Sequence, residues 1–203
     1  RDCLLSRGLG DVYKRQGQKA EKTPDIQYFM VVGAGIEEGV DSVPGGNGCT
    51  INFGQIRPRS RGFVELNGRS MDQAPRIVPN YFADPYDLDA LVEGFQVADR
   101  IMEQSVFKPY IARRHVPAPQ VKSREEIARF CEEIAHAALH PSGTCRMGSD
   151  AEAVVSPELR VHGIQRLRVA DASIMPTLVS GNPNSVCIMI GEKLADMIRR
   201  ERQ

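Results

Sequence analysis

Strand-like segments dominate the chain before residue 80, and capped helical patterns follow them. Ile26–Val32, Thr50–Ile56 and Phe63–Leu66 are rich in β-branched and aromatic residues or alternate in polarity, as strands do. Two shorter strands are expected on either side of a glycine turn, at Leu159–Val161 and Leu167–Val169. This order of strands, helices, short strands and a last helix predicts an α+β fold.

Three helices are predicted from capping residues and apolar periodicity. Asp84-Pro85 opens the first, with Asp as the N-cap and Pro at the first helical position. Ser123 opens the second, and Glu126 three residues later completes a capping box. The third is expected over about 182–200. Because Val186–Ile190 is apolar on most sides of that helix, we expect its first half to be buried.

The composition excludes several classes of function. Lysine plus arginine balances aspartate plus glutamate at 26 each among 203 residues, so no nucleic-acid partner is expected. No apolar run approaches the roughly 18 residues that a membrane span needs. The five cysteines are scattered without a Cys-x-x-Cys pair, and there is no secretory signal, which favours reduced thiols and a cytoplasmic location.

Residues Arg1–Gln16 differ from the rest of the chain. They show neither helical nor strand periodicity. Their sequence resembles the translated adapter read-through found at the ends of metagenomic gene fragments, and an amphipathic lead-in helix is the alternative. We therefore interpret 1–16 as a non-native artefact and exclude it from the predicted fold.

Val31–Gly39 imitates a dinucleotide-binding motif. It follows a strand and has Gly33 and Gly35 in place, but Glu38 stands where Gly-x-Gly-x-x-Gly requires a glycine. The turn-rich residues that follow would break any helix able to hold a pyrophosphate. A loop between two strands is the preferred interpretation.

His136 and His140 have the spacing of zinc ligands on a helix. The catalytic glutamate of His-Glu-x-x-His is absent, and Pro141 disfavours a helix that runs through His140. A zinc hydrolase is kept only as an alternative and no metal is predicted. His136 is expected to cap carbonyl groups at a helix end.

His140 and Asn182 are the candidate catalytic residues. The segment 140–148 reads His-Pro-Ser-Gly-Thr-Cys-Arg-Met-Gly, whose proline and glycines predict a bent loop that can place a side chain in a site. A neutral imidazole there can take up a proton near physiological pH. Asn182 precedes the last helix, whose N-terminal N–H groups can stabilise developing negative charge. A structural histidine and a simple N-cap are the alternatives.

Long motifs recur in order through the second half of the chain. They occupy 140–148, Leu159–Ile164, Leu167–Pro176, Ser180–Asn182 and Ile188–Ile198, with Arg57–Gly62 and Pro79–Tyr81 upstream. Together these segments resemble the C-terminal part of the glucose–methanol–choline (GMC) flavin oxidoreductases, in their choline-dehydrogenase-like form. The resemblance covers about residues 24–199.

The resemblance implies an FAD cofactor and assigns roles to individual residues. His140 matches the catalytic base of the family, and Asn182 matches its second active-site residue. Asp171 and Ala172 match residues along the FAD pyrophosphate and ribityl chain. Asn182 and Pro183 match positions near the flavin ring.

The resemblance also implies a division of the chain. Residues 17–138 would form a substrate-binding domain with a mainly antiparallel sheet and flanking helices. Residues 139–203 would form the closing strand–helix segment of an FAD-binding α/β domain. The strand and Gly-x-Gly-x-x-Gly motif that open this family do not occur in the sequence, so the chain is expected to be a fragment that is inactive alone.

The implied function is oxidation of the CH–OH group of a small-molecule alcohol, either choline-like or another primary alcohol. A base would remove the hydroxyl proton, and hydride would pass to FAD. Membrane association is not indicated. The alternative is a truncated, non-catalytic open reading frame or an interaction module without a cofactor.

Overall fold

The computed structural model describes residues 4–5, 11–15, 23–33, 47–201 and 203. The chain divides into two compact units. The first comprises Arg1–Ser60 and Tyr81–His136, and the second comprises Arg61–Asn80 and Ala137–Gln203. The last change of unit therefore falls near the domain boundary expected after residue 138, whereas residues 61–80 make their contacts with the second unit.

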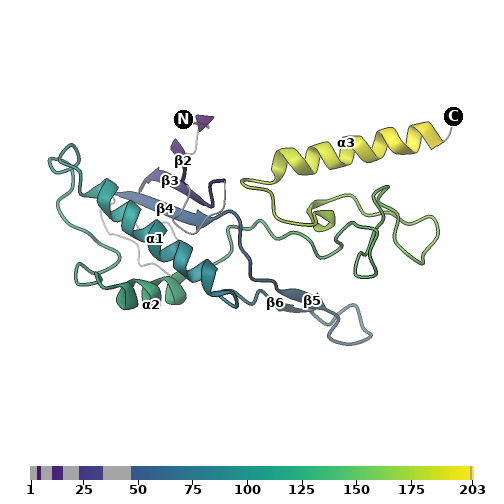
Figure 1. Ribbon diagram of the computed structural model, residues 1–203, viewed down its shortest axis with the longest axis horizontal. Helices are drawn as coiled ribbons and strands as arrows, with labels where there is room; N and C mark the ends of the chain where they lie inside the picture. The colour runs from purple at the N-terminus through teal and green to yellow at the C-terminus, as the bar shows by residue number, and fades with distance from the viewer. Residues whose placement is uncertain (1–3, 6–10, 16–22, 34–46, 202) are drawn as a thin grey trace. The chain divides into compact units, whose positions relative to one another are not determined.

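The first unit contains an antiparallel sheet with the strand order β1–β2–β3–β4 (Figure 1). Its strands are β1 (Leu4–Leu5), β2 (Asp11–Arg15), β3 (Ile26–Val32) and β4 (Cys49–Gln55). β3 and β4 pair along their whole length, from Ile26 opposite Gln55 to Val32 opposite Cys49. They confirm the first two strands predicted from the sequence.

β1 and β2 lie within residues 1–16, which were expected to stand outside the fold. β2 pairs with β3 from Val12 opposite Phe29 to Arg15 opposite Ile26. Backbone hydrogen bonding to an existing strand needs no side-chain periodicity, which is the signal that this segment lacks. Excluding β1 and β2 from the fold, or expecting a helix there, was therefore wrong. A non-native origin of the segment stays a prediction.

The motif that imitates a dinucleotide fingerprint begins a connection between antiparallel neighbours. The Gly33 N–H donates to the Gly48 carbonyl at 2.8 Å, and the Thr50 hydroxyl donates to the Gly33 carbonyl at 2.8 Å. A dinucleotide motif would instead lead from a strand into a crossover helix. The loop interpretation is thus confirmed at both ends of the connection, and residues 34–46 lie outside the described residues.

α1 (Pro85–Met102) packs across the sheet (Figure 1). The Asp84 carboxylate accepts the Tyr86 N–H at 2.9 Å, which confirms the predicted N-cap. Gly94 approaches the sheet so closely that a Cβ there would lie 2.9 Å from the Phe53 ring. The Tyr28 hydroxyl donates to the Gly94 carbonyl at 3.2 Å. The buried residues of this core are Ile26, Tyr28, Ala90, Val97 and Ala98.

α2 (Arg124–Ile134) packs against α1, and Phe53 of β4 packs against the buried cluster between the two helices. The predicted capping box is present, because Ser123 and Glu126 accept each other's backbone N–H groups. Phe95 of α1 and Phe130 of α2 meet edge to face, with ring centroids 5.9 Å apart. Burial raises the pKa of the Cys131 thiol to about 12, so it packs as a small apolar side chain.

Two buried carboxylates attach neighbouring segments to α1. Asp87 accepts the backbone N–H groups of Arg59 and Ser60 at 2.8 Å each. The Arg59 guanidinium lies 3.9 Å from the centroid of the Tyr86 ring, and the Tyr86 hydroxyl donates to Asp25 at 2.6 Å. Burial, followed by the bond to Asp25, raises the pKa of Tyr86. The Arg57–Ser60 turn is thereby held to the first turn of the helix.

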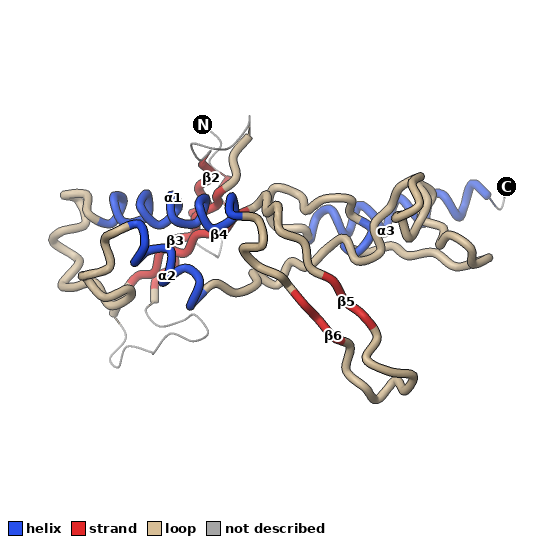
Figure 2. Tube along the Cα trace, turned by 60° about the horizontal axis from the view of Figure 1, so that its bottom comes forward, coloured by secondary structure: helices blue, strands red, loops and turns tan. Residues whose placement is uncertain are grey.

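The second unit is mostly irregular before its last helix (Figure 2). Its regular elements are the hairpin of β5 (Phe63–Glu65) and β6 (Arg76–Val78), the 3₁₀ turn η1 (Ala172–Ile174) and α3 (Asn184–Glu201). Its buried core consists of Val155, Leu159, Ile174, Met175 and Ile190. None of the helices among the described residues combines the length and apolar character that a bilayer span requires.

Two expectations for this unit need correction. The short strands predicted at 159–161 and 167–169 reduce to a single bridge, Arg160 opposite Arg168, with two backbone hydrogen bonds. The first half of α3 is also less buried than its apolar pattern predicted. Ile190 is buried, but Ile188 and Met189 are 61% and 54% exposed because the core lies on one side of the helix only.

Candidate functional site

His140 lies in an irregular loop, as its proline and glycines predicted. Leu139, immediately before it, has φ of 57°, and Gly143 has φ of 85°, both in the left-handed region. A Cβ on Gly143 would also lie 3.2 Å from the Met175 carbonyl oxygen. The loop therefore turns sharply on both sides of His140, whose side chain is half-buried.

The His140 loop is attached to η1 by backbone hydrogen bonds. N–H groups of the loop donate to carbonyls of the 3₁₀ turn: Gly143 to Ala172 at 3.3 Å, Cys145 to Ser173 at 2.9 Å and Met147 to Ile174 at 2.8 Å. Main-chain bonds of this kind survive most side-chain substitutions, because only proline removes the donor. They fix the loop beside Ala172, one of the residues expected to line the cofactor.

Asp171 has a structural role that was not predicted from the amino-acid sequence. Its carboxylate accepts the N–H of Ser173 at 2.8 Å and the Ser173 hydroxyl at 2.5 Å, so it caps η1. The side chain is exposed, and neighbouring Ala172 is half-buried. Contact of either residue with FAD stays a prediction.

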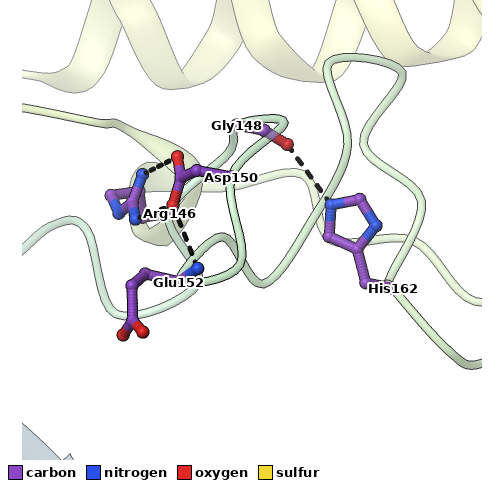
Figure 3. Close-up of polar contacts among 5 residues, drawn as sticks. All are labelled: Arg146, Gly148, Asp150, Glu152 and His162. Carbon is purple, nitrogen blue, oxygen red and sulfur yellow. Dashed lines mark hydrogen bonds and ion pairs between the residues drawn. The ribbon is translucent and has the colours of Figure 1, made fainter.

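An ion pair closes the far end of the His140 loop (Figure 3). Arg146 binds both oxygens of Asp150, with Nη1 to Oδ2 at 2.9 Å and Nη2 to Oδ1 at 2.7 Å. The Glu152 N–H also donates to Asp150, and a ring nitrogen of His162 lies 3.3 Å from the Gly148 carbonyl. The bonds from Arg146 hold the pKa of Asp150 below its usual range, and Asp150 raises the pKa of Arg146.

Asn182 stands just before α3, as predicted, and its side chain is exposed. The first helical residue is Asn184, two positions after Asn182. Gly181 has φ of 156°, and its N–H donates to the Val179 carbonyl at 2.8 Å. Pro183 is buried, and its carbonyl accepts the Cys187 N–H at 2.9 Å, the first bond of the helix. A role of Asn182 or Pro183 at the flavin stays a prediction.

One apolar core joins the segments that carry these residues. Met147 of the His140 loop, Ala172 of η1 and Val186 of α3 all pack against the buried cluster that contains Ile174, Met175 and Ile190. The His140 loop, η1 and the start of α3 therefore belong to one compact structure. That the His140 and Asn182 side chains meet over a single ring stays a prediction.

The arrangement around His136 does not have the helical geometry on which the zinc alternative depends. α2 ends at Ile134, and a ring nitrogen of His136 lies 3.1 Å from the Ile134 carbonyl. The predicted capping role of His136 is thus confirmed. Within the described residues, no group of three or more histidine, cysteine or acidic side chains could hold a metal ion.

Two sets of paired residues in the second unit were missed from the sequence. The Arg146–Asp150 pair has a recognisable signal, opposite charges four residues apart, although the segment is a loop. Glu201 at the end of α3 pairs with Arg160, at 2.7 Å, and with Arg168. These pairs tie the C-terminal helix to the bridged segment, and their wide sequence separation gives no local signal.

Comparison with known proteins places the chain in one group of enzymes. The family model described as GMC oxidoreductase matches residues 58–191. The oxygen-dependent choline dehydrogenase of Escherichia coli O45:K1 is 40% identical over 176 residues, which are 87% of this chain and 31% of the relative. The Pseudomonas fluorescens enzyme of the same name is 41% identical with the same coverage. The chain thus spans about a third of the length of these curated relatives.

Solved structures agree with the sequence matches. Pyridoxine 4-oxidase from Mesorbium loti has a TM-score of 0.85 at 27% identity, over 94% of this chain and 38% of that one. A variant of the formate oxidase of Aspergillus oryzae, studied for FAD modification, has a TM-score of 0.84 at 31% identity, over 90% and 32%. The α+β arrangement is therefore shared with enzymes of known structure.

Proposed function

The chain belongs to the GMC oxidoreductase family, and we propose that it contributes His140 and Asn182 to the active site of a flavin-dependent enzyme that oxidises the CH–OH group of a small alcohol. The observation that carries the proposal is the core shared by the His140 loop, η1 and the start of α3. Backbone bonds hold the His140 loop against η1, and both pack with the start of α3. Residues 42 positions apart are thus carried by one compact unit.

The residues present fit the ring end of FAD. A half-buried imidazole, an exposed carboxamide and the N-terminus of an 18-residue helix provide hydrogen bonding and positive potential suited to ring carbonyls or an alkoxide. The Asp171 carboxylate suits a pyrophosphate less well, because like charges repel. We propose that Asp171 acts by keeping η1 in shape beside the cofactor, with Ala172 adjoining it.

The proposed mechanism gives each side chain one task. Bound FAD would supply the hydride acceptor, a chemistry that amino-acid side chains lack. The neutral His140 imidazole takes the hydroxyl proton of the alcohol. The Asn182 carboxamide donates to the alcohol oxygen and holds it in position while negative charge develops there. Pro183, with its fixed φ, sets the backbone direction that brings Asn182 to the start of α3.

Small primary alcohols are the proposed substrates, and choline is the first candidate. This choice follows the relatives named as choline dehydrogenases, at 40–41% identity. The two structurally similar proteins named above are a pyridoxine 4-oxidase and a formate oxidase. Their different substrates indicate that the family fold alone does not select the substrate.

A fused protein tests the proposal. The chain would be joined to the part of the Escherichia coli choline dehydrogenase outside the matched region, and flavin absorbance would verify cofactor binding. Stopped-flow bleaching of the flavin by choline and other primary alcohols then measures the reductive step. We expect H140A to slow this step by about 10²–10⁴-fold and N182A by about 10²–10³-fold.

His162→Ala is the matched control, since His162 is exposed and bonds only weakly to Gly148, at 3.3 Å. Its rate should stay within about twofold of the parent. If H140A and N182A behave like this control, the proposed roles are wrong.

A further inference from the structure

The connection between α1 and α2 carries charge of one sign. It leaves the end of α1 at Glu103 and projects beyond that helix before it returns to α2 (Figure 1). No acidic residue occurs between Glu103 and Glu125, although the whole chain has 26 charged residues of each sign. The same interval holds five cations: Lys108, Arg113, Arg114, Lys122 and Arg124. A cationic surface therefore lies on a chain that is neutral overall.

Two of the five cations are neutralised by α1. Arg114 pairs with Asp99, and Arg124 pairs with Asp89. These two pairs tie the connection to the helix. The other three cations form no ion pair within the part of the chain that the structure describes, and all three are exposed: Lys108, Arg113 and Lys122. Three positive charges are thus presented to solvent without a compensating carboxylate.

Apolar side chains stand among these cations. Hydrogen-bonded turns order residues 104–111, where the N–H groups of Tyr110 and Ile111 donate to the Phe107 carbonyl at 2.9 and 3.1 Å. Phe107 and Ile111 are half-buried and anchor the turns, whereas Val106 is 66% exposed and Tyr110 is 84% exposed. Val116 is 42% exposed. Single exposed apolar residues are ordinary, but aromatic and branched side chains interspersed with cations are typical of membrane interfaces.

An anionic lipid surface fits both properties of the connection. Anionic headgroups attract each nearby lysine or arginine. A tyrosine can place its ring at the level of the headgroups and keep its hydroxyl in water, and valine side chains add apolar contact at the acyl boundary. An acidic protein would match the charge, but lysine is depleted at protein interfaces and two of the three unpaired cations are lysines. The composition therefore favours lipid.

We propose that the α1–α2 connection binds the surface of an anionic lipid bilayer, with Lys108, Arg113 and Lys122 at the headgroups and Tyr110 beside them. Binding of this kind needs a surface segment and no spanning helix. The connection belongs to the first unit, whereas His140 and Asn182 belong to the second. Attachment to lipid therefore uses residues other than those proposed for catalysis, and it depends neither on FAD nor on alcohol oxidation.

Sedimentation of the 203-residue chain with lipid vesicles tests the proposal. Vesicles of phosphatidylcholine alone are compared with vesicles of phosphatidylcholine and phosphatidylglycerol in equal parts. We expect the chain to bind the anionic vesicles at least about tenfold more tightly, since each cation near such a surface contributes about fivefold. Added salt should weaken this binding by screening. Replacing Lys108, Arg113 and Lys122 together with glutamine should weaken it at least about tenfold.

The matched control removes the same charge from the second unit. Glutamine at three exposed positions there should leave vesicle binding within about twofold of the parent: Arg166, Lys193 and Arg199. Equal weakening by the two triple variants would show attraction by net charge alone and would overturn the proposal. Tyr110→Ala should weaken binding at least about twofold, whereas Ile164→Ala, at a second-unit residue that is 56% exposed, should leave it unchanged.

Hydrogen exchange on the unmodified chain gives a readout that needs no variant. Amides within residues 104–122 should exchange more slowly on anionic vesicles than in solution, while those within 155–169 should not change. Equal binding to neutral and anionic vesicles, or unchanged exchange over 104–122, would overturn the proposal. A dimer that forms without lipid and is lost in the variant of Lys108, Arg113 and Lys122 would also overturn it and would identify a second copy as the partner.

Discussion

Replacing Asp87 with asparagine should destabilise the first unit. The Asp87 side chain is 3% exposed, and its two oxygens accept the backbone N–H groups of Arg59 and Ser60 at 2.8 Å each. An asparagine amide offers one acceptor oxygen and an NH₂ donor, so one of the two backbone N–H groups loses its partner. The Arg57–Ser60 turn then loses half of its attachment to α1.

The expected magnitude follows from that single lost bond. A hydrogen bond to a charged group contributes about 1.5–3 kcal/mol, and an unsatisfied buried donor costs a similar amount. We therefore expect D87N to lower the free energy of unfolding of the first unit by about 2–3 kcal/mol. At about 2–4 °C per kcal/mol, the midpoint of thermal unfolding should fall by about 4–12 °C.

Far-UV circular dichroism measures the midpoint, and hydrogen exchange reports on the Arg59 and Ser60 amides directly. The control is Glu132→Gln, which makes the same chemical change at an exposed position of α2 and should shift the midpoint by less than about 2 °C. If D87N and Glu132→Gln have the same midpoint of thermal unfolding, and the Arg59 and Ser60 amides of D87N exchange at the parent rate, the two hydrogen bonds do not hold the turn.

Two further changes test packing and charge. Gly94→Ala should be neutral or destabilising by up to about 2 kcal/mol, since overpacking offsets the helix propensity of alanine. Gly191→Ala, with nothing within 4 Å of its new Cβ, should stabilise α3 by about 0.5–1 kcal/mol. If Gly94→Ala and Gly191→Ala raise the midpoint of thermal unfolding equally, the close approach at Gly94 is refuted. The hydrogen bonds from Arg146 lower the pKa of Asp150. The Arg146–Asp150 ion pair therefore stabilises the folded chain above about pH 4, and this stabilisation is lost as the pH falls further. The gap in urea midpoint between the parent and Asp150→Asn should accordingly narrow from about pH 6 to pH 2, and a constant gap would contradict the coupling.

Helix starts could be predicted because their signals lie on adjacent residues. Asp84 accepts a bond from a residue two positions away, and Ser123 and Glu126 satisfy each other within one turn. Loop 140–148 was equally accessible, since its glycines and proline restrict the backbone locally. These features depend on short-range sterics and hydrogen bonding, which a single sequence expresses directly.

Contacts between distant segments could not be predicted in the same way. The bonds that attach the His140 loop to η1 run between backbone groups, which are the same in every residue except proline and so leave no trace in residue type. Asp87 binds a turn 27 and 28 residues upstream, and Glu201 binds arginines on the bridged segment. β2 is a further example, because its pairing depends on the strand beside it.

The prediction that failed for α3 carries its own information. The start of α3 is apolar on most sides, yet Ile188 and Met189 remain exposed because the helix packs along one side only. Val64 and Ile77 of the β5–β6 hairpin show the same mismatch between apolar character and exposure. Both elements lie in the unit that carries His140 and Asn182. His140 stands three residues before the first bond to η1, and Asn182 stands two residues before α3, so main-chain structure anchors each residue within a few positions.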